Sequence, residues 1–288
     1  MKRAAWCSFL LFFSSLSWAQ ELSVSDAFRC AVIGDTGTGG KAQYEVGARL
    51  ADLHSDLKFD SVLMLGDNLY GSQKPKDFRD KFELPYARLL EAGVNFYAVL
   101  GNHDQPSQQS YKAFHMDGRR YYSVEPRANV RFIGLDSNRL DKEQLAWLEK
   151  ELAQSIDDWK IVFFHHPIYS SGARHGSNLP LRTALEPLFV KYGVAIVLSG
   201  HDHFYERMKP QKGVNYFVVG GAAKVRVGNA RRTAISAQAF DRDNSFLLMD
   251  IDKDILHFKA ISRAGKVVDE GSIPRPGIAA PTNLQPLR

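Results

Sequence analysis

The sequence predicts an α/β fold, and three observations support this prediction. Short apolar runs typical of buried strands alternate with longer stretches typical of helices. A glycine followed by Asp, Asn or His comes directly after several of these runs. The composition, with 44% hydrophobic and 24% charged residues in a chain of 288, is that of an ordinary globular protein. The chain is therefore long enough for one large domain or two small ones.

The predicted elements follow this alternating order along the chain. Because the early runs are almost continuously apolar, we expect buried strands at 28–33, 61–65, 96–99, 130–135, 160–164 and 194–198. The stretches between them predict helices at 42–57, 77–91, 142–155 and 182–191. Later strands are predicted at 216–219, 246–251, 255–260 and 267–273. Residues 274–288 contain four prolines and show little periodicity, which predicts a flexible tail.

The first nineteen residues predict a secretory signal peptide. Lys2 and Arg3 precede an uncharged stretch at 6–18, and Ser17-Trp18-Ala19 forms a small-x-small cleavage pattern. The stretch is shorter than the roughly 20 residues that a transmembrane helix needs. No later stretch is apolar enough to cross a bilayer. We therefore expect an exported protein, periplasmic or secreted, without a membrane span.

Cysteine content and charge limit the possible partners. Cleavage after Ala19 removes Cys7 and leaves Cys30, which lies in the first predicted strand, so we expect a buried thiol and no disulfide. The formal charge of +5 becomes +3 after cleavage, with 35 basic and 32 acidic residues. This mild excess suits a small anionic substrate. Since the one basic cluster, at 224–232, has no interleaved aromatic residues, we expect a solvated loop there and no nucleic-acid partner.

The glycine-rich loop after the first predicted strand could serve phosphate or metal binding. Gly40-Lys41 suggests a phosphate-binding P-loop, but Asp35 stands where that motif has its first glycine. Ala42 stands where the motif has Ser or Thr, so no hydroxyl is present to bind Mg²⁺. The loop could also place Asp35 as the cap of the following helix. The other strand ends decide between these interpretations.

Similar polar residues follow five of the predicted strands. The motifs are Gly34-Asp35, Gly66-Asp67, Gly101-Asn102-His103-Asp104, His165-His166 and Gly200-His201-Asp202-His203. A sixth histidine, His175, follows in a glycine-rich loop. Ligands bind at the carboxyl ends of strands in open α/β sheets, and glycine lets the chain turn sharply there. A lone histidine is usually an ordinary polar residue, but five such loops indicate a metal or acid–base site.

These motifs resemble those of the purple acid phosphatases, which are binuclear metallophosphoesterases of the calcineurin-like superfamily. GDTG (34–37), GDNLY (66–70), GNHD (101–104), VFFH (162–165) and GHDH (200–203) occur in the order of that family. The sequence is most similar to the small tartrate-resistant type, and the resemblance covers about 28–273. It implies a four-layer αββα sandwich, in which helices flank two central mixed sheets. It also implies an exported acid phosphatase that hydrolyses small phosphate monoesters by attack of a metal-bound hydroxide.

The resemblance also implies a ligand set for two metals. The first metal would be held by Asp35, Tyr70 and His203, the second by Asn102, His165 and His201, and Asp67 would bridge them. A phenolate is a hard, charged donor that suits Fe³⁺, whereas imidazole and amide ligands suit a divalent ion such as Fe²⁺, Zn²⁺ or Mn²⁺. His103 and His175 would be catalytic, because they match active-site histidines that hold the phosphoryl group or protonate the leaving alcohol.

Some neighbouring residues and functions stay open. Asp104 could orient His103 or cap a turn, His166 would lie behind the ligands, and Asp202 would point away from the metals. His54, His115 and His257 lie outside the motifs, and we expect no catalytic role for them. A phosphodiesterase or nucleotidase could use the same metals, and a binding protein could use the scaffold without catalysis. The sequence is silent on the oligomeric state.

Overall fold

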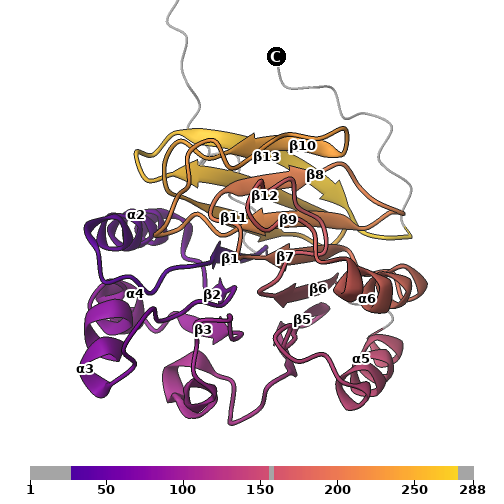
Figure 1. The fold of residues 1–288 in the computed structure, drawn as a ribbon, viewed down its shortest axis with the longest axis horizontal. Coiled ribbons are helices and arrows are strands. Elements are labelled where there is room, and N and C mark those ends of the chain that lie inside the picture. The colour runs from indigo at the N-terminus through magenta and orange to yellow at the C-terminus, as the bar shows by residue number, and fades with distance from the viewer. Residues whose placement is uncertain (1–26, 156–158, 278–288) are drawn as a thin grey trace, which may run out of the picture.

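A computed structural model describes residues 27–155 and 159–277, with two mixed sheets facing each other and helices on their outer faces (Figure 1). Helices α2, α3 and α4 lie on the side of the first sheet, and helices α5 and α6 lie on the side of the second. The predicted α/β class and the two flanked mixed sheets are therefore confirmed. The predicted signal peptide and residues 278–288 of the predicted tail lie outside the described residues, while Pro274 closes the last strand.

The first sheet joins early and late parts of the chain. Its strand order is β13-β12-β11-β1-β2-β3. Its early strands are parallel: β1 (Phe28–Ile33), β2 (Ser61–Met64) and β3 (Asn95–Ala98). Its late strands are antiparallel: β11 (Ser245–Ile251), β12 (Ile255–Ser262) and β13 (Val267–Pro274). Because β11 pairs with β1, the C-terminal hairpins extend the N-terminal sheet.

The second sheet has the order β10-β8-β9-β7-β6-β5-β4. Four adjacent strands in its centre are parallel: β5 (Val130–Gly134), β6 (Trp159–Phe164), β7 (Ile196–Ser199) and β9 (Asn215–Val219). Three antiparallel strands were not predicted: β4 (Tyr122–Arg127), β8 (Tyr205–Met208) and β10 (Ser236–Phe240). Each is short and carries polar residues or a proline, so none has the apolar pattern of a buried strand.

Three predicted helices form nearly as expected: α2 (Lys41–Leu57), α5 (Lys142–Gln154) and α6 (Leu179–Lys191). Helix α6 begins earlier than predicted, because the Asn178 side chain accepts a hydrogen bond from the N–H of Leu181 and caps the helix. The predicted helix at 77–91 is wrong. It divides into α3 (Pro75–Phe78), a π-helical turn (Arg79–Glu83) and α4 (Ala87–Glu91). Pro85 lies at the second break, where it has no N–H to continue the helix.

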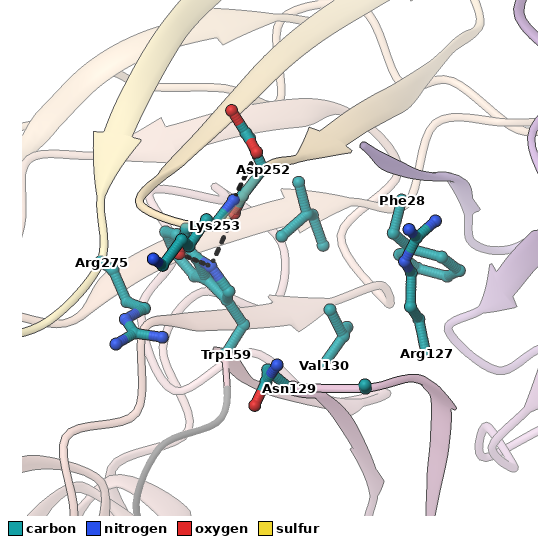
Figure 2. Close-up of a pocket in the computed structure, with 10 residues that line it drawn as sticks. Phe28, Arg127, Asn129, Val130, Trp159, Asp252, Lys253 and Arg275 are labelled. Carbon is teal, nitrogen blue, oxygen red and sulfur yellow. Dashed lines mark hydrogen bonds between the residues drawn. The ribbon is translucent and has the colours of Figure 1, made fainter. Parts of the chain in front are cut away.

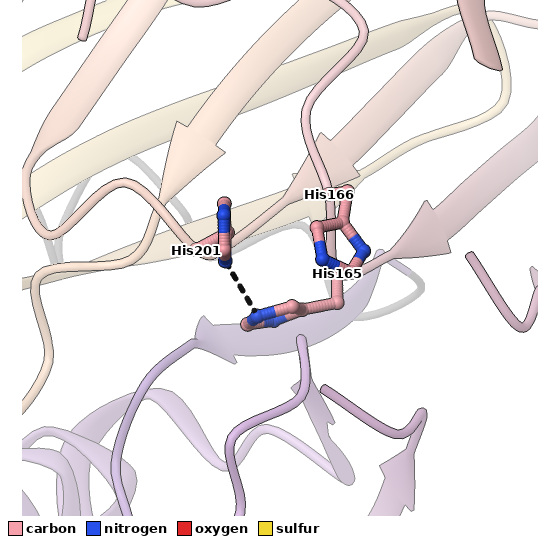
Figure 3. A group of neighbouring side chains, drawn as sticks. All are labelled: His165, His166 and His201. Atoms are coloured by element: carbon pink, nitrogen blue, oxygen red, sulfur yellow. Dashed lines mark hydrogen bonds between the residues drawn. The ribbon is translucent and has the colours of Figure 1, made fainter. Parts of the chain in front are cut away.

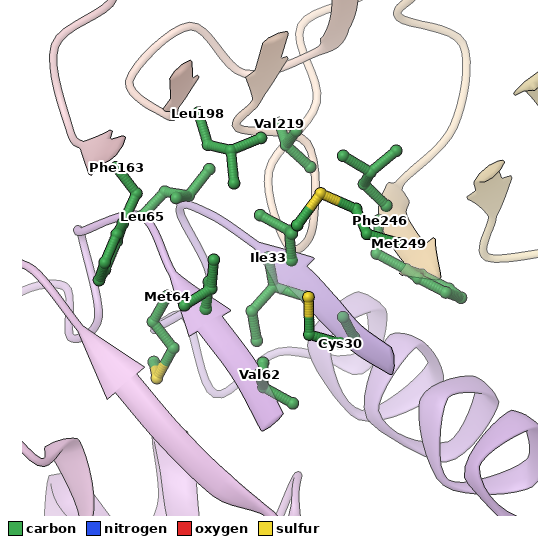
Figure 4. Packing of buried hydrophobic residues seen from close by; sticks show 14 of the residues in the cluster. Cys30, Ile33, Val62, Met64, Leu65, Phe163, Leu198, Val219, Phe246 and Met249 are labelled. Atoms are coloured by element: carbon green, nitrogen blue, oxygen red, sulfur yellow. The ribbon is translucent and has the colours of Figure 1, made fainter. Parts of the chain in front are cut away.

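The main core lies between the facing sheets, and Figure 4 shows its centre. Ile33 and Leu65 come from the first sheet and meet Leu198 and Val219 from the second. Cys30 is fully buried here, and this burial raises the pKa of its thiol well above the ordinary value. A second core packs α5 and α6 against the outer face of the second sheet. Such cores fix the strand ends in position.

No helix within 27–155 and 159–277 has the length and apolar character needed to cross a membrane.

Candidate metal centre

The five predicted strand-end motifs converge at one edge of the two sheets. Asp35 follows β1, Asp67 follows β2, and Asn102 follows β3 in the first sheet. His165 directly follows β6, and His201 follows β7, in the second sheet. Backbone hydrogen bonds join neighbouring ends, from Asp35 N to Gly66 O at 3.1 Å and from Gly200 N to His165 O at 3.0 Å.

Three of the converging residues have left-handed backbone conformations. The φ angles are 57° at Asp35, 51° at Asp67 and 68° at His201. Such angles are strained for residues other than glycine and occur often at functional sites. The loops also pack very closely, because a Cβ at Gly200 would lie 2.6 Å from Asp35 Oδ2. Glycine therefore lets one strand end approach the carboxylate of another, as expected from the sequence.

The first group of donor atoms consists of Asp35, Tyr70 and His203. Tyr70 Oη donates a hydrogen bond to Asp35 Oδ1 at 3.1 Å and lies 3.4 Å from His203 Nε2. His203 Nε2 lies 3.2 Å from the same carboxylate oxygen. The other oxygen, Asp35 Oδ2, accepts a hydrogen bond from His201 N at 2.8 Å, which fixes the carboxylate. The donor atoms of Asp35, Asp67 and His203 lie within 4.8 Å of one another.

The second group consists of Asn102, His165 and His201. His165 Nε2 lies 3.0 Å from Asn102 Oδ1 and 3.1 Å from His201 Nδ1. Figure 3 shows the two imidazoles turned toward each other, with His166 beside them. His165 Nδ1 lies 2.9 Å from Leu65 O, so its Nε2 faces the other donor atoms. This backbone contact is of the kind that orients metal-binding histidines.

Asp67 lies between the two groups. Its Oδ1 is 3.5 Å from His165 Nε2 in the second group, while its side chain also belongs to the cluster with Asp35 and His203. His103 N donates a hydrogen bond to the same Oδ1 at 3.0 Å. The structure therefore brings together all seven residues that the sequence predicted as ligands.

The electrostatics of the site fit a bound cation. Burial and then the nearby Asp67 raise the pKa of Asp35 well above its ordinary value. Neither carboxylate forms an ion pair with a Lys or Arg of the described residues. Burial lowers the pKa of His201 to about 2 and that of His203 to about 4, so both imidazoles are neutral, as metal ligands must be. Buried carboxylates beside neutral imidazoles and a phenol form a donor set that needs positive charge.

The two predicted catalytic histidines lie at the mouth of the site. The His103 ring lies 5.0 Å from the Tyr70 ring, and the His175 ring lies 4.2 Å from the His201 ring, between centroids. Both histidines are exposed. A cavity of about 540 Å³ opens beside His175 and His201. One histidine therefore borders the first group of donor atoms and the other borders the second.

The structure decides between the two roles considered for Asp104. Its carboxylate accepts hydrogen bonds from the N–H groups of Gly101, Asn68 and Leu69 at 2.8–3.0 Å, and from Gln108 Nε2. No contact between Asp104 and the His103 ring is found among the described residues. Asp104 therefore caps the turn and joins the two loops that carry Asp67 and Asn102.

His166 and Asp202 support different parts of the site. His166 Nδ1 lies 2.9 Å from Ser137 Oγ, and its ring lies 4.5 Å from the His201 ring. Together with His165 and His201 it forms a group of nitrogen atoms within 4.8 Å, closer to the donors than the sequence suggested. Asp202 is buried and faces the loop of His175, where Oδ2 accepts hydrogen bonds from Ser170 Oγ at 2.5 Å and Gly176 N at 3.2 Å.

Two cations at the site were missed in the sequence. Lys224 Nζ lies 3.1 Å from the centroid of the Tyr70 ring, and Arg226 Nη1 lies 3.3 Å from His175 Nε2. The expected solvated loop is therefore wrong for these two residues. One sequence feature could have indicated that this loop lies at the site. Gly220-Gly221 comes directly after the predicted strand at 216–219 and repeats the glycine pattern of the other strand ends.

A second cavity, of about 480 Å³, lies at the amino ends of the strands (Figure 2). It is lined by the starts of β1, β5 and β6, including Phe28, Val130 and Trp159. Trp159 Nε1 donates to the carbonyl oxygens of Asp252 and Lys253, at 3.1 and 3.3 Å. This cavity is therefore remote from the candidate metal centre.

A sandwich of two mixed sheets, with carboxylate, amide and imidazole donors at its strand ends, defines a metallophosphoesterase architecture. The family model of the calcineurin-like phosphoesterases matches residues 28–205. The chain therefore belongs to the calcineurin-like phosphoesterase family.

Curated relatives narrow the comparison to acid phosphatases. The tartrate-resistant acid phosphatase type 5 of Oryctolagus cuniculus is 29% identical over 259 residues, which cover 75% of this chain and 79% of the relative. The Homo sapiens protein of the same name is 28% identical over 75% of this chain and 79% of its own length. The Fe(3+)-Zn(2+) purple acid phosphatase 12 of Arabidopsis thaliana is 29% identical, over 57% of this chain and 40% of the relative. The predicted resemblance to this group of hydrolases is confirmed.

Solved structures confirm the fold. Purple acid phosphatase PPD1 from Lupinus luteus has a TM-score of 0.72 at 21% identity, covering 88% of this chain and 54% of that one. GAP50, described as the anchor in the inner membrane complex of Plasmodium, has a TM-score of 0.74 at 19% identity, covering 86% and 89%. Since one neighbour is an enzyme and the other is described as an anchor, the site must carry the functional argument.

Proposed function

We propose that this protein is an exported, binuclear-metal acid phosphatase that hydrolyses small phosphate monoesters. The observation that carries the proposal is the convergence of seven donor residues from five strand ends, with two buried carboxylates that lack a Lys or Arg partner among the described residues. The named acid phosphatases among the relatives support the reaction class.

The donor types suggest which ion each group would hold. Asp35, Tyr70 and His203 offer two oxygens and a nitrogen, which suit Fe³⁺, as in the relative named for Fe(3+) and Zn(2+). Asn102, His165 and His201 would hold a divalent ion, Fe²⁺, Zn²⁺ or Mn²⁺, and Asp67 would be shared. Bound metals would neutralise the phosphate charge and lower the pKa of a coordinated water enough to allow hydrolysis in acid.

The chain itself would orient the ester and handle the leaving group. His103 and His175 stand on opposite sides of the mouth, each beside a different group of donor atoms. From these positions either imidazole could donate a hydrogen bond to a phosphoryl oxygen or a proton to the departing alcohol. The nearby Lys224 and Arg226 add positive charge at the mouth of the site, which suits an anionic phosphate ester.

The first test measures metal content, visible spectrum and phenyl phosphate hydrolysis of the mature protein purified without chelator. We expect about two metal ions per chain including iron, a band in the green region, and activity in acid. Tyr70→Phe should lose the band, whereas Tyr44→Phe, on the exposed side of α2, should keep it. Two metals and an unchanged spectrum in Tyr70→Phe would exclude the Tyr70–iron assignment. If the protein takes up no metal after reconstitution, the binding-protein alternative is favoured.

Export is tested separately from the chemistry. The predicted signal peptide at 1–19 implies that the mature chain begins at Gln20. N-terminal sequencing of the protein after expression in a secreting host should find that residue. An intact Met1 in the recovered protein would contradict export.

A further inference from the structure

The π-helical turn at Arg79–Glu83 lies beside the loop that carries Tyr70. Single π-helical turns are rare and occur often at functional sites. Phe82 anchors this turn in the core, because its ring is fully buried and packs edge-on against the ring of Phe96, at 5.1 Å between centroids. The side chain of Lys81, directly before Phe82 in the sequence, therefore starts from a rigid part of the chain.

The ammonium group of Lys81 binds the backbone of the Tyr70 loop. Lys81 Nζ donates hydrogen bonds to Tyr70 O at 2.7 Å and to Ser72 O at 3.0 Å. Gly71, between these two residues, has a φ of 70°, and this left-handed bend lets both carbonyls face the same ammonium. Asp77 Oδ1 lies 2.8 Å from Lys81 Nζ and accepts the third hydrogen. All three N–H donors of the ammonium therefore have an acceptor.

The backbone of Lys81 is linked to the other loop of the first donor group. Its carbonyl accepts a hydrogen bond from Gln43 Nε2, and Gln43 Oε1 accepts one from Gly39 N at 2.8 Å. Gly39 belongs to the glycine-rich loop that begins with Asp35, and Gln43 is fully buried on α2. Through its side chain and its carbonyl, Lys81 therefore connects the two loops that supply Asp35 and Tyr70.

The ion pair between Lys81 and Asp77 is suited to acid conditions. The hydrogen bond from Lys81 lowers the pKa of Asp77 to about 2, so this carboxylate stays charged in mild acid. The Lys81 side chain is only 16% exposed. Removing its ammonium would leave the carbonyls of Tyr70 and Ser72 without this donor, and an acceptor that loses its partner away from water is costly.

We propose that Lys81 is a positioning residue for Tyr70, which keeps the phenol oxygen where it can bind the metal of the first donor group. This inference rests on the proposed metal-dependent function, because it takes Tyr70 as a ligand. Tyr70 Oη lies 3.1 Å from Asp35 Oδ1, so a shift of the Tyr70 backbone would separate the two oxygens that must meet at the metal. Groups that orient metal ligands typically change metal affinity or activity by about ten- to hundredfold when they are removed.

The first test compares Lys81→Met with wild type in the metal-loaded mature protein. The substitution nearly preserves the length of the side chain and removes its three donors. We expect the visible band of Tyr70 and iron to shift or lose intensity, and iron retention against a competing chelator to fall about tenfold. Asp77→Asn, which weakens the support of the ammonium, should change both in the same direction by a smaller factor. Lys76→Met, at a lysine that is 77% exposed on α3, should change neither.

The second test uses the same mature chain in chelator and needs no metal. The amide of Tyr70 donates to Gly37 O at 2.9 Å, so it should exchange with deuterium more slowly while the loop is held in place. Exchange across residues 69–73 should be faster in Lys81→Met than in wild type or Lys76→Met. If wild type itself binds no iron, the proposed metal centre fails, and faster exchange would still show that Lys81 positions the loop.

Two outcomes would overturn the role of Lys81. An unchanged band, unchanged iron retention and unchanged exchange in Lys81→Met would mean that the loop keeps its position without the ammonium. Loss of iron with an unchanged band position and a lower free energy of unfolding in urea would mean that Lys81 supports the fold in general and does not position Tyr70.

Discussion

Two buried carboxylates of the first sheet have opposite surroundings. Asp250, on β11, is paired with Arg29 of β1, at 2.8 Å from Asp250 Oδ2 to Arg29 Nε. Asp35, at the other end of β1, is also buried, but it forms no ion pair with a Lys or Arg of the described residues, and Asp67, Tyr70 and His203 lie beside it. Asp250 is therefore balanced by a cation of the fold itself, whereas Asp35 and Asp67 place two carboxylates side by side without one, which favours a bound cation.

The largest expected effect comes from removing the unpaired carboxylate. Asp35→Asn should lower kcat/KM on phenyl phosphate by about a thousandfold and reduce the metal content, because a charged donor is lost. Lys41→Ala, in the same glycine-rich segment, should change neither, since Lys41 is exposed and faces Glu45. Steady-state kinetics and metal analysis check both. Inactivation by Lys41→Ala alone would restore the phosphate-loop interpretation.

Breaking the ion pair of Asp250 should have the opposite effect, lowering the stability of the protein and leaving its activity unchanged. Arg29→Met leaves Asp250 buried without this partner, so we expect the free energy of unfolding to fall by about 2–3 kcal/mol. Activity should be unchanged once the protein is folded, because Arg29 lies near the amino end of β1, away from the metal centre. Urea unfolding and kinetics on the same sample test this. The double variant with Asp250→Asn should recover part of the stability. A fall in kcat/KM without a fall in stability would contradict the assignment of a structural role to the Arg29–Asp250 pair.

A smaller effect is expected at the contact that holds the His175 loop. Ser170→Ala removes the hydrogen bond to Asp202 Oδ2, which helps to position His175. We expect kcat/KM to fall about fivefold to tenfold with full metal occupancy, because misplaced groups slow the chemistry but leave the ligands intact. Kinetics with metal analysis separate this result from ligand loss. A metal-poor Ser170→Ala protein would show that the loop supports the ligands as well.

The smallest effect concerns pH in the metal-free protein. Burial beside Asp67 raises the pKa of Asp35 above the value of about 3.9 in an unfolded chain. The folded state then holds this proton to higher pH, so its stabilising contribution is present below about pH 4 and is lost as pH rises through the folded pKa. Asp35→Asn avoids that loss. Its free energy of unfolding relative to wild type should therefore rise as the pH increases above about 4.

Urea unfolding in the presence of chelator, at several pH values, measures this difference. The histidine contributions are largely shared by the two proteins and cancel in the comparison. A difference that shrinks as pH rises would show that the Asp35 carboxylate is stabilised in its charged form without any metal, and the contrast with Asp250 would fail.

Much of the fold was predictable because buried parallel strands need nearly continuous apolar runs. The apolar runs at 28–33 and 160–164 predicted β1 and β6 in this way. The strand β8 was missed because it carries Glu206 and Arg207 within four residues. Glu206 is tolerated there because it accepts hydrogen bonds from Ser171 N and Ser236 Oγ, partners that only the folded chain supplies.

Four donor residues were also predictable, since the glycine directly before each marks a strand end and strand ends share an edge of the sheet: Asp35, Asp67, Asn102 and His201. The hydrogen-bond partners of the neighbouring residues were not predictable. The sequence left two roles open for Asp104, and hydrogen bonds from N–H groups 35 and 36 residues away show that it caps the turn.

Local chemistry along the chain is enough to place apolar strands, the turns after them and the polar residues that those turns expose, because each depends on neighbours in sequence. Folding decided which of these turns meet. The hydrogen bond from His201 N to Asp35 Oδ2 joins residues 166 positions apart. Lys224 and Arg226 became part of the site only because β9 lies beside β7 in the second sheet. Charge on a loop has no local pattern that shows which strand end it will cover, so its role depends on tertiary packing.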